Sequence, residues 1–379
     1  MGEIETCKRC IMDNHNDPDL VLDENGICNH CHNFDREFDK IPKGEAATIH
    51  FNNTINEIKA YGEGHEYDCI IGLSGGVDST YLCYVAKQNG LRPLLVHCDN
   101  GWNSELSVKN IENICKHTGF DLFTLVIDWE EMKDIQLSFF KAGVVDLELP
   151  YDYALIITAY KAAEKHKIKY VLTGHNVITE GTYLPKSWRH SKMDIANITS
   201  IHRKFGHVKF KSFPYYSFIH QRLIDRRLKY LYLLNYTNYD KAGVKELIKK
   251  EFEWRDYGGK HYENIFTRFY QGYILKEKFG FDKRQFHLSV LVQSGLMKRK
   301  DALAEYALPG YEEDLFKQDK EYVIKKLGFT NQSFDEYMAA PIKNHNEYAT
   351  EEKYWDIYFR LVKILRPIVR LIKPKRIRS

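Results

Sequence analysis

Four cysteines near the start of the chain stand in two close pairs whose spacing suits a metal ion. Two residues separate Cys7 from Cys10, two separate Cys28 from Cys31, and 17 lie between the pairs. This spacing lets both thiolates of a pair face one ion, and the connecting loop brings the second pair round to complete a tetrahedron. Four thiolates leave no open position, so we predict a structural zinc ribbon. A redox pair and an iron–sulfur site are the alternatives.

A glycine-rich segment after an apolar run has the composition of a phosphate-binding loop. Two glycines let the backbone approach an anion, serines add hydroxyl donors, and the following helix offers unpaired N–H groups at its N-terminus. No lysine follows the glycines, which excludes the Walker pattern. We therefore expect a polyphosphate at Ser74, Gly75, Gly76, Val77, Asp78 and Ser79.

The elements around this loop alternate between short apolar runs and helical periods. Such alternation predicts buried parallel strands joined by helices, that is, an α/β doubly wound, mostly parallel sheet. The expected strands are 69–73, 93–97, 122–127 and 170–173, and the expected helices lie near 78–89, 104–118 and 151–166. Beyond about residue 220 we expect no strands but a helical region, with helices over 241–252, 265–279 and 311–327.

Polar residues follow two of these strands at the edge where open α/β sheets bind ligands. His97, Asp99 and Asn100 end the second strand, and Gly174, His175 and Glu180 follow the fourth. A histidine at a strand end is a candidate functional group, although a structural role is as common.

Two glycine turns in the helical region carry adjacent cations. Lys260 and His261 follow Gly259, and Lys283 and Arg284 follow Gly280. Cations beside glycine turns suit phosphate or sugar-nucleotide contacts, and solvated surface charge is the alternative.

The composition sets outer limits on function. The 379 residues include 44% hydrophobic and 28% charged residues, enough to bury a core, and the net charge of +3 argues against nucleic-acid binding. We find no stretch apolar enough to span a membrane and no signal-peptide pattern, so we expect a cytoplasmic protein.

The segment SGGVDS after a hydrophobic strand resembles the signature of the N-type ATP pyrophosphatases, the PP-loop superfamily. The resemblance implies a HUP-like fold, ATP as substrate and pyrophosphate held by the loop. It also implies that Asp78 helps to hold Mg²⁺ and that residues 97–101 lie near the adenosine.

Three further segments narrow the resemblance: the cysteine ribbon, DNGWNSE at 99–105, and YGGKHYENIFTRFYQGYILKEKFGFDKRQFHLS at 257–289. With them, the chain is similar from Cys7 to about Tyr348 to the N-acetyl sugar amidotransferases of bacterial surface-polysaccharide biosynthesis. These enzymes act on lipopolysaccharide and O-antigen precursors.

That resemblance implies a reaction on a nucleotide-linked sugar. The acetamido oxygen would attack the α-phosphate of ATP, and ammonia would then displace AMP to leave an acetamidino group. The residues that we expect to be catalytic are Asp78, His175, Lys260 and His261.

The ammonia needs a source outside this chain. Residue 2 is glycine, and none of Cys69, Cys83, Cys98 or Cys115 stands in a G-x-C-x-G context, so we expect no glutaminase activity. The resemblance implies a separate glutaminase subunit, with a cyclase-like barrel subunit as a candidate conduit.

The last twenty residues form a basic amphipathic stretch. From Arg360 to Ser379 there are eight basic residues and no acidic one. Such a stretch suits peripheral contact with an anionic inner membrane, or docking on protein. We predict four units: a ribbon (1–50), a PP-loop domain (51–235), a helical substrate or partner region (236–350) and this tail (351–379).

Two other functions stay open at this point. Some PP-loop enzymes with zinc ribbons thiolate tRNA, but we find no third C-x-x-C after the loop. A non-catalytic nucleotide-binding scaffold is the other alternative.

Overall fold

The computed structural model describes residues 3–182, 184–237, 239–259, 262–355, 357–358 and 360. Within them, five parallel strands form one sheet in the order β3-β2-β1-β4-β5. The strands are β1 (Cys69–Gly72), β2 (Pro93–Asp99), β3 (Leu122–Val126), β4 (Tyr170–Leu172) and β5 (Lys229–Leu231). The order runs outward from β1 in both directions, so the predicted doubly wound α/β fold is confirmed.

The position of each strand in the sheet explains its sequence. β1, β2 and β4 lie inside the sheet and are almost wholly buried, as their continuous apolar runs predict. β3 is an edge strand, and its Leu122 and Val126 are exposed. The expectation that this run is buried is therefore wrong, because an edge strand is covered on fewer sides.

The fifth strand corrects the expectation that strands stop near residue 220. β5 extends the sheet beside β4, with Tyr170 paired to Lys229 and Leu172 to Leu231. It has three residues and a largely exposed pattern, so it carries no periodic signal. Its strand conformation comes from hydrogen bonding to β4.

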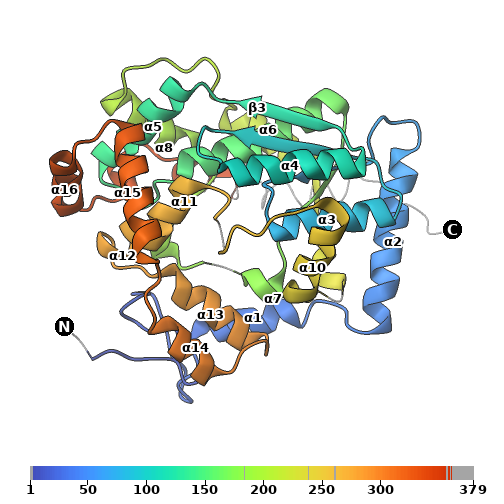
Figure 1. The fold of residues 1–379 in the computed structure, drawn as a ribbon, viewed down its shortest axis with the longest axis horizontal. Coiled ribbons are helices and arrows are strands. Elements are labelled where there is room, and N and C mark those ends of the chain that lie inside the picture. Colours follow the sequence, from blue (N-terminus) through green and yellow to red (C-terminus); the bar gives the residue numbers. More distant parts are fainter. Residues whose placement is uncertain are drawn as a thin grey trace.

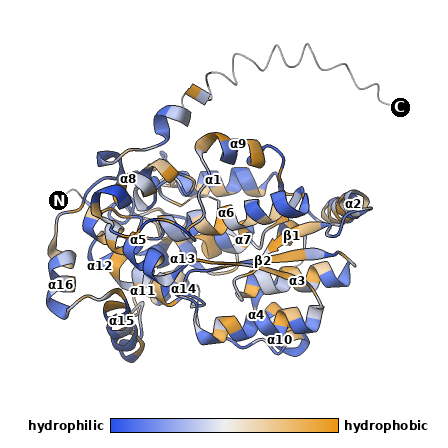
Figure 2. Ribbon diagram, turned by 90° about the horizontal axis from the view of Figure 1, so that it is seen from above, coloured by the Kyte–Doolittle hydropathy of each residue, from blue (hydrophilic) through white to orange (hydrophobic). Residues whose placement is uncertain are grey.

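Helices cover both faces of the sheet. Figure 2 shows α3, α4 and α10 on one side of the strands and α6 and α9 on the other. Their bounds, with those of the helices beside them, are α2 (Glu45–Gly62), α3 (Val77–Gln88), α4 (Glu105–Thr118), α5 (Trp129–Ala142), α6 (Leu149–His166), α7 (Val177–Glu180), α8 (Ile195–Phe205), α9 (Phe218–Asp225) and α10 (Lys241–Phe252).

The C-terminal region is helical, as predicted. Its elements are α11 (Ile265–Phe269), a π-helical turn (Tyr270–Ile274), α12 (Leu275–Glu277), α13 (Lys283–Gln293), α14 (Arg299–Tyr306), α15 (Glu313–Leu327) and α16 (Asn331–Ala339). Among the described residues, every helix is too short or too polar to cross a bilayer. The predicted basic stretch lies outside the described residues after Arg360. The four domain boundaries remain predictions.

The N-terminal segment packs against the helical region, below the sheet in the view of Figure 1. Figure 1 shows the N-terminal segment and α1 (Asn29–Phe38) beside α13 and α14. Arg299 at the start of α14 donates to the carbonyl oxygens of Cys7 and Cys10, at 3.1 and 2.9 Å. Phe34 of α1 joins Phe286 and Val290 of α13 in one apolar cluster. The cysteine segment is therefore built into the helical region.

The segment after α10, residues 253–257, is attached to α4 by the buried side-chain amide of Asn110. Asn110 on α4 donates to the Arg255 carbonyl and accepts from the Arg255 amide, both at 2.9 Å. Trp254 donates from its indole nitrogen to the Gly75 carbonyl at 2.8 Å. These contacts hold residues 253–257 over the loop that follows β1.

We predict that Asn110→Ala lowers the free energy of unfolding by about 1–3 kcal/mol. The substitution removes both hydrogen bonds of a fully buried amide and leaves the Arg255 backbone groups without them. Urea unfolding followed by circular dichroism measures the change. Lys109→Ala, at the exposed neighbouring position, is the matched control. An equal effect of the two substitutions would contradict this role of Asn110.

Candidate functional site

The loop after β1 owes its shape to two close backbone approaches. Gly75 has a φ of +78°, and a Cβ atom there would lie 2.9 Å from the Ser107 carbonyl oxygen. Ser107 also donates to the Ser74 carbonyl at 2.9 Å. Gly174, after β4, would place a Cβ 3.1 Å from the backbone of Asp78. Both positions require glycine for the loop to pack between α4 and the end of β4.

The helix that follows the loop begins with an open N-terminus. Gly76 is the N-cap of α3 and, having no side chain, it does not cap the first turn. The Ser79 and Thr80 hydroxyls instead donate back to the Gly76 carbonyl, at 3.2 and 2.6 Å. The helix dipole and the N–H groups of the first turn favour an anion at this end.

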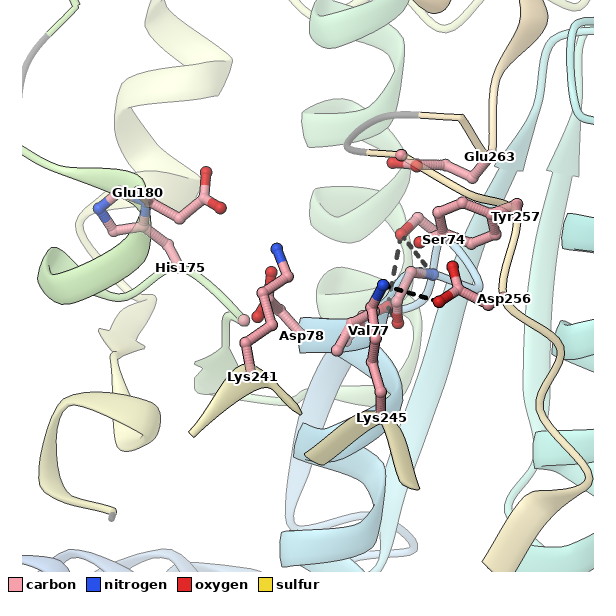
Figure 3. Close-up of a pocket in the computed structure, with 14 residues that line it drawn as sticks. Ser74, Val77, Asp78, His175, Glu180, Lys241, Lys245, Asp256, Tyr257 and Glu263 are labelled. Carbon is pink, nitrogen blue, oxygen red and sulfur yellow. Dashed lines mark hydrogen bonds and ion pairs between the residues drawn. The ribbon is translucent and has the colours of Figure 1, made fainter. Parts of the chain in front are cut away.

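A cavity of about 340 Å³ opens over this N-terminus, and we call it the loop cleft. It lies where the chain runs in opposite directions from β1 and β4, which is where open α/β sheets bind ligands. Figure 3 shows the side chains that converge on it. Its lining residues are Ser74, Gly76, Val77, Asp78, Ser79, Gly174, His175, Glu180, Lys241, Lys245, Asp256, Tyr257, Gly259 and Glu263.

The charges in the loop cleft are of both signs. Lys241 and Lys245 are one turn apart at the start of α10, and Lys245 Nζ lies 2.7 Å from Asp256 Oδ2. Figure 3 shows both amines directed toward the loop. The Tyr239 hydroxyl donates to the Asp78 carboxylate. Burial and the Asp78 charge raise the pKa of Tyr239, so this hydroxyl keeps its proton.

The structure brings most of the predicted phosphate-loop residues together. Ser74, Gly76, Val77, Asp78 and Ser79 line the cleft, and Gly75 supports it from behind. The predicted residues after β4, namely Gly174, His175 and Glu180, also line it.

The residues that end β2 lie elsewhere. His97 is buried between the Leu73 carbonyl and the Asn103 amide, and burial lowers its pKa. Asp99 accepts from the Gly101 amide, and Asn100 from the Trp102 amide. None of the three is among the residues that line the loop cleft. Their side chains shape the turn after β2.

The cations predicted at the glycine turns divide into three cases. Lys260 and His261 lie outside the described residues. Lys283 lines a second cavity, described below. Arg284 is held by Asp282 at 2.8 Å and donates to the Leu308 carbonyl at 2.9 Å, away from the loop cleft.

Four charged residues of the cleft were not singled out from the sequence: Lys241, Lys245, Asp256 and Glu263. The two lysines, four residues apart at the start of a helix, carried a usable signal, because that spacing puts them on one helix face. Asp256 and Glu263 carried none. Asp256 reaches the cleft because residues 253–257 are anchored on Asn110 and the Gly75 carbonyl. Glu263 is held separately, because its carbonyl accepts a hydrogen bond from the Ser104 amide at 2.9 Å.

A second cavity, of about 330 Å³, adjoins the loop cleft, and we call it the polar cavity. Ser74 and Glu263 line both cavities. The remaining residues that line the polar cavity are Asp146, Glu148, Tyr151, Asp152, Leu155, Leu184, Trp188, Arg189, Lys192, Asn264, Thr267, Tyr270, Gln271, Leu275 and Lys283.

A network of paired charges organises this second cavity. Lys192 Nζ lies 2.7 Å from Asp146 Oδ2 and 2.7 Å from Asp152 Oδ2. Burial opposes the charge of Lys192, but the surrounding carboxylates outweigh burial and raise its pKa. Gln271 donates to Glu148 at 2.8 Å. Burial and the nearby Asp152 charge raise the pKa of Glu148.

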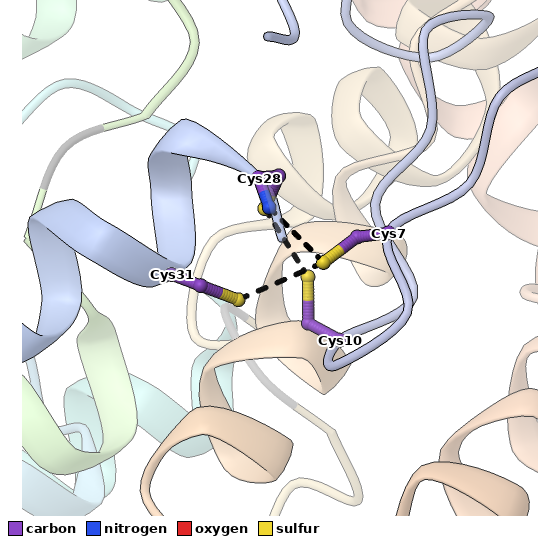
Figure 4. Close-up of side chains that lie close together, drawn as sticks. All are labelled: Cys7, Cys10, Cys28 and Cys31. Atoms are coloured by element: carbon purple, nitrogen blue, oxygen red, sulfur yellow. Dashed lines mark hydrogen bonds between the residues drawn. The ribbon is translucent and has the colours of Figure 1, made fainter. Parts of the chain in front are cut away.

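The four predicted metal ligands converge on one point. Their Sγ atoms all lie within 4.8 Å of one another, with Cys7–Cys31 at 3.9 Å and Cys10–Cys28 at 3.6 Å. Tetrahedral zinc with Zn–S bonds of about 2.3 Å requires sulfur–sulfur edges of about 3.8 Å. All four cysteines are buried, and Figure 4 shows the thiols facing each other between the first loop and α1. The cluster thus fits a zinc ion.

The sheet and loop define the type of fold. A parallel 3-2-1-4-5 sheet with a Gly-Gly loop and an open helix N-terminus at its switch point is a doubly wound α/β fold with a phosphate-binding type of loop. Residues 263–362 match the family model of the LPS biosynthesis protein WbpG-like C-terminal domain. The matched region includes most of the segment 257–289, on which the sequence resemblance rests.

Two curated proteins match shorter segments. The uncharacterized protein MJ1599 of Methanocaldococcus jannaschii is 28% identical over 119 residues, which are 30% of this chain and 40% of that protein. The tRNA(Ile)-lysidine synthase of Chlamydia pneumoniae is 37% identical over 71 residues, 18% of this chain and 22% of the synthase. The chain therefore spans less than half the length of these relatives.

Solved structures overlap the chain only loosely. NMN synthetase from Francisella tularensis aligns at 12% identity over 60% of this chain and 93% of its own, with a TM-score of 0.29. The U34-tRNA thiolase NcsA from Methanococcus maripaludis, with its [4Fe-4S] cluster, aligns at 13% identity over 78% and 88%, with a TM-score of 0.32. Overlaps at this level assign no function.

We predict that the purified protein carries one zinc ion per chain and that Cys28→Ser loses it. Loss of the ion leaves buried thiols without their common partner and loosens the packing of α1 on α13. Elemental mass spectrometry measures the metal, and thermal unfolding should shift to lower temperature. Cys115→Ser, outside the cluster, is the control. A visible iron–sulfur absorption band in the purified protein would contradict a zinc site.

A second prediction concerns His345, which supports the wall of the polar cavity. It is buried, with Nδ1 donating to Asn197 Oδ1 at 2.8 Å and Nε2 accepting from the Asp146 amide at 3.2 Å. Burial lowers the pKa of His345 to about 3. As the pH falls, His345 therefore takes up a proton in the unfolded chain before it does so in the folded protein. The free energy of unfolding consequently decreases as the pH falls below about 6.5.

Between pH 7 and pH 5, the wild type should lose about 2 kcal/mol more unfolding free energy than His345→Gln. Denaturant titrations at both pH values measure the difference. His15→Gln, at an exposed position, should follow the wild type. Parallel pH curves for the wild type and His345→Gln would refute the assignment.

Proposed function

We propose that this protein is an ATP-dependent amidotransferase that converts an acetamido group of a nucleotide-linked sugar into an acetamidino group in O-antigen biosynthesis. One observation carries the proposal: the WbpG-like region supplies residues to both cavities. Glu263 lines the loop cleft and the polar cavity, and Asn264, Gln271 and Lys283 line the polar cavity. A lipopolysaccharide-biosynthesis domain thus adjoins a PP-loop.

The first step activates a poor electrophile. The acetamido oxygen attacks the α-phosphorus of ATP, the bond to the β-phosphate oxygen breaks, and pyrophosphate leaves. The open N-terminus of α3 and the nearby Lys241 and Lys245 support this step, because a helix N-terminus and two cations would stabilise the departing charge. Positioned donors and cations of this kind lower a barrier because they need no reorganisation during the reaction.

The second step replaces the activated oxygen. Ammonia attacks the imidate carbon and loses a proton, and AMP departs with the former acetamido oxygen. The carbon then carries two nitrogens, which makes the product an amidine. Each turnover consumes one ATP and one ammonia and releases one AMP and one pyrophosphate.

The carboxylates of the loop cleft suit Mg²⁺. Asp78 and Glu180 present hard oxygen donors beside the phosphate loop, which is the donor type that Mg²⁺ prefers. The ion would supply charge neutralisation on the phosphates. His175, which lines the same cleft, is proposed to contact the nucleotide.

A separate glutaminase subunit is proposed as the ammonia source, with a cyclase-like barrel subunit as its conduit. The thiols outside the ribbon support an external source. Cys69, Cys83 and Cys98 are buried, and burial raises the pKa of each, to about 11 for Cys98. Protonated, buried thiols are poor nucleophiles for glutamine hydrolysis and for sulfur transfer to tRNA.

The reaction is tested by incubating the protein with Mg-ATP, an ammonium salt and a panel of UDP- and CMP-linked diacetamido sugars. We expect a product in which one oxygen has become NH, formed with one AMP per turnover, by mass spectrometry. AMP release stimulated by tRNA, or no turnover with any sugar or added glutaminase, would refute the proposal.

Lys245→Met should lower kcat/KM for ATP about 100-fold, since it removes a cation beside the loop. Lys249→Met is the matched control, because Lys249 lies one turn further along α10 and pairs with Glu246 on the surface. Equal activity of the two variants would remove Lys245 from the site.

A further inference from the structure

The polar cavity has a lining that suits a neutral, hydroxyl-rich ligand. Four carboxylates (Asp146, Glu148, Asp152 and Glu263) face three cations (Arg189, Lys192 and Lys283). Lys192 is already paired with two of the carboxylates. A pocket with this balance gives no excess positive charge for a polyphosphate, whereas paired carboxylates and amides offer many hydrogen-bonding positions for hydroxyl groups.

One buried donor in this cavity has no partner in the described part of the protein. Asn264 is 4% exposed, and its Oδ1 accepts from the Thr267 amide at 2.9 Å to cap α11. Its Nδ2 atom is buried and has no hydrogen-bond acceptor among the described residues. An unsatisfied buried donor costs about 1–3 kcal/mol, so a ligand acceptor here would recover that free energy.

The two sides of the polar cavity differ in their surroundings. Ser74 and Glu263 are shared with the loop cleft. Arg189 is shared with another hollow, lined by Lys186, His190 and Lys343 among others. A ligand in the polar cavity therefore has the phosphate loop at one side and exposed cations at the other. Trp188 and Tyr270 also line the cavity, and aromatic side chains are of the type that packs on the C–H face of a sugar ring.

We propose that the polar cavity binds the N-acetylated sugar ring, with the acetamido group at the Ser74 and Glu263 side and Asn264 Nδ2 donating to a ligand oxygen. This inference rests on the proposed function and names the site of its acceptor substrate. The orientation puts the acetamido oxygen next to the loop that holds the nucleotide. It also puts a carboxylate beside the new amidine, which is protonated at neutral pH like the guanidinium of arginine.

The test measures sugar binding without turnover. Isothermal titration calorimetry of the full chain, without ATP, compares UDP-linked N-acetylated sugars, including UDP-N-acetylglucosamine, with UDP-glucose and UDP. We expect the N-acetylated sugars to bind more tightly than UDP-glucose. Asn264→Asp and Asn264→Ser should each weaken that binding about tenfold, since both residues keep the helix cap and neither supplies the amide donor.

Lys245→Met, in the loop cleft, should have the opposite pattern of effects on nucleotide binding and sugar binding. It should weaken binding of α,β-methylene-ATP and leave sugar binding unchanged, whereas both Asn264 variants should leave nucleotide binding unchanged. Wild-type affinity for the N-acetylated sugars in both Asn264 variants would overturn the inference. The absence of wild-type binding to any N-acetylated sugar would also overturn it.

The two proposals fail separately. Amidine formation with an unchanged KM for the sugar in the Asn264 variants would sustain the proposed function and overturn this assignment of the cavity. Sugar binding that depends on Asn264, without any amidine product, would sustain the cavity and overturn the reaction.

Discussion

The open N-terminus of α3 is the constraint on which the rest of the structure depends. A helix end with uncapped N–H groups binds an anion only if the protein backbone around it stays close without filling the space. Gly75 and Gly174 allow that approach from two directions, one against Ser107 and one against Asp78. The parallel strand order then places the end of β4 beside the loop. The binding site is thus a consequence of sheet topology and of two positions without a Cβ atom.

The cysteine cluster contributes to the fold by holding together the N-terminal segment, which packs against the helical region. Its two pairs belong to a segment too small to bury a core, yet that segment packs on α13 and accepts hydrogen bonds from Arg299. Lys283, the first residue of α13, lines the polar cavity. A metal ion held by the cluster would therefore stabilise a helix that begins at the polar cavity.

The two cavities have different electrostatic environments. The loop cleft collects cations from α10 around a helix N-terminus, an arrangement that favours phosphate. The polar cavity balances carboxylates against cations and leaves one amide donor unsatisfied, an arrangement that favours hydroxyl and amide oxygens. Ser74 and Glu263 stand between them. A reaction that joins a phosphate to an amide oxygen needs two such environments in contact.

The sequence by itself determined the local features of this protein. Cys-x-x-C pairs, the Gly-Gly loop after an apolar run and the interior strands were predictable, because spacing and periodicity are local properties. The tertiary structure alone decided which residues meet. β5, Asp256 and Glu263 carried no local signal. A strand of three residues depends on β4, Asp256 depends on the anchoring of residues 253–257, and Glu263 depends on the backbone contact with Ser104. The tertiary structure also placed His97 and Arg284 in structural contacts with the Leu73 and Leu308 carbonyls, since neighbours far away in the sequence determine whether a polar side chain reaches a cavity.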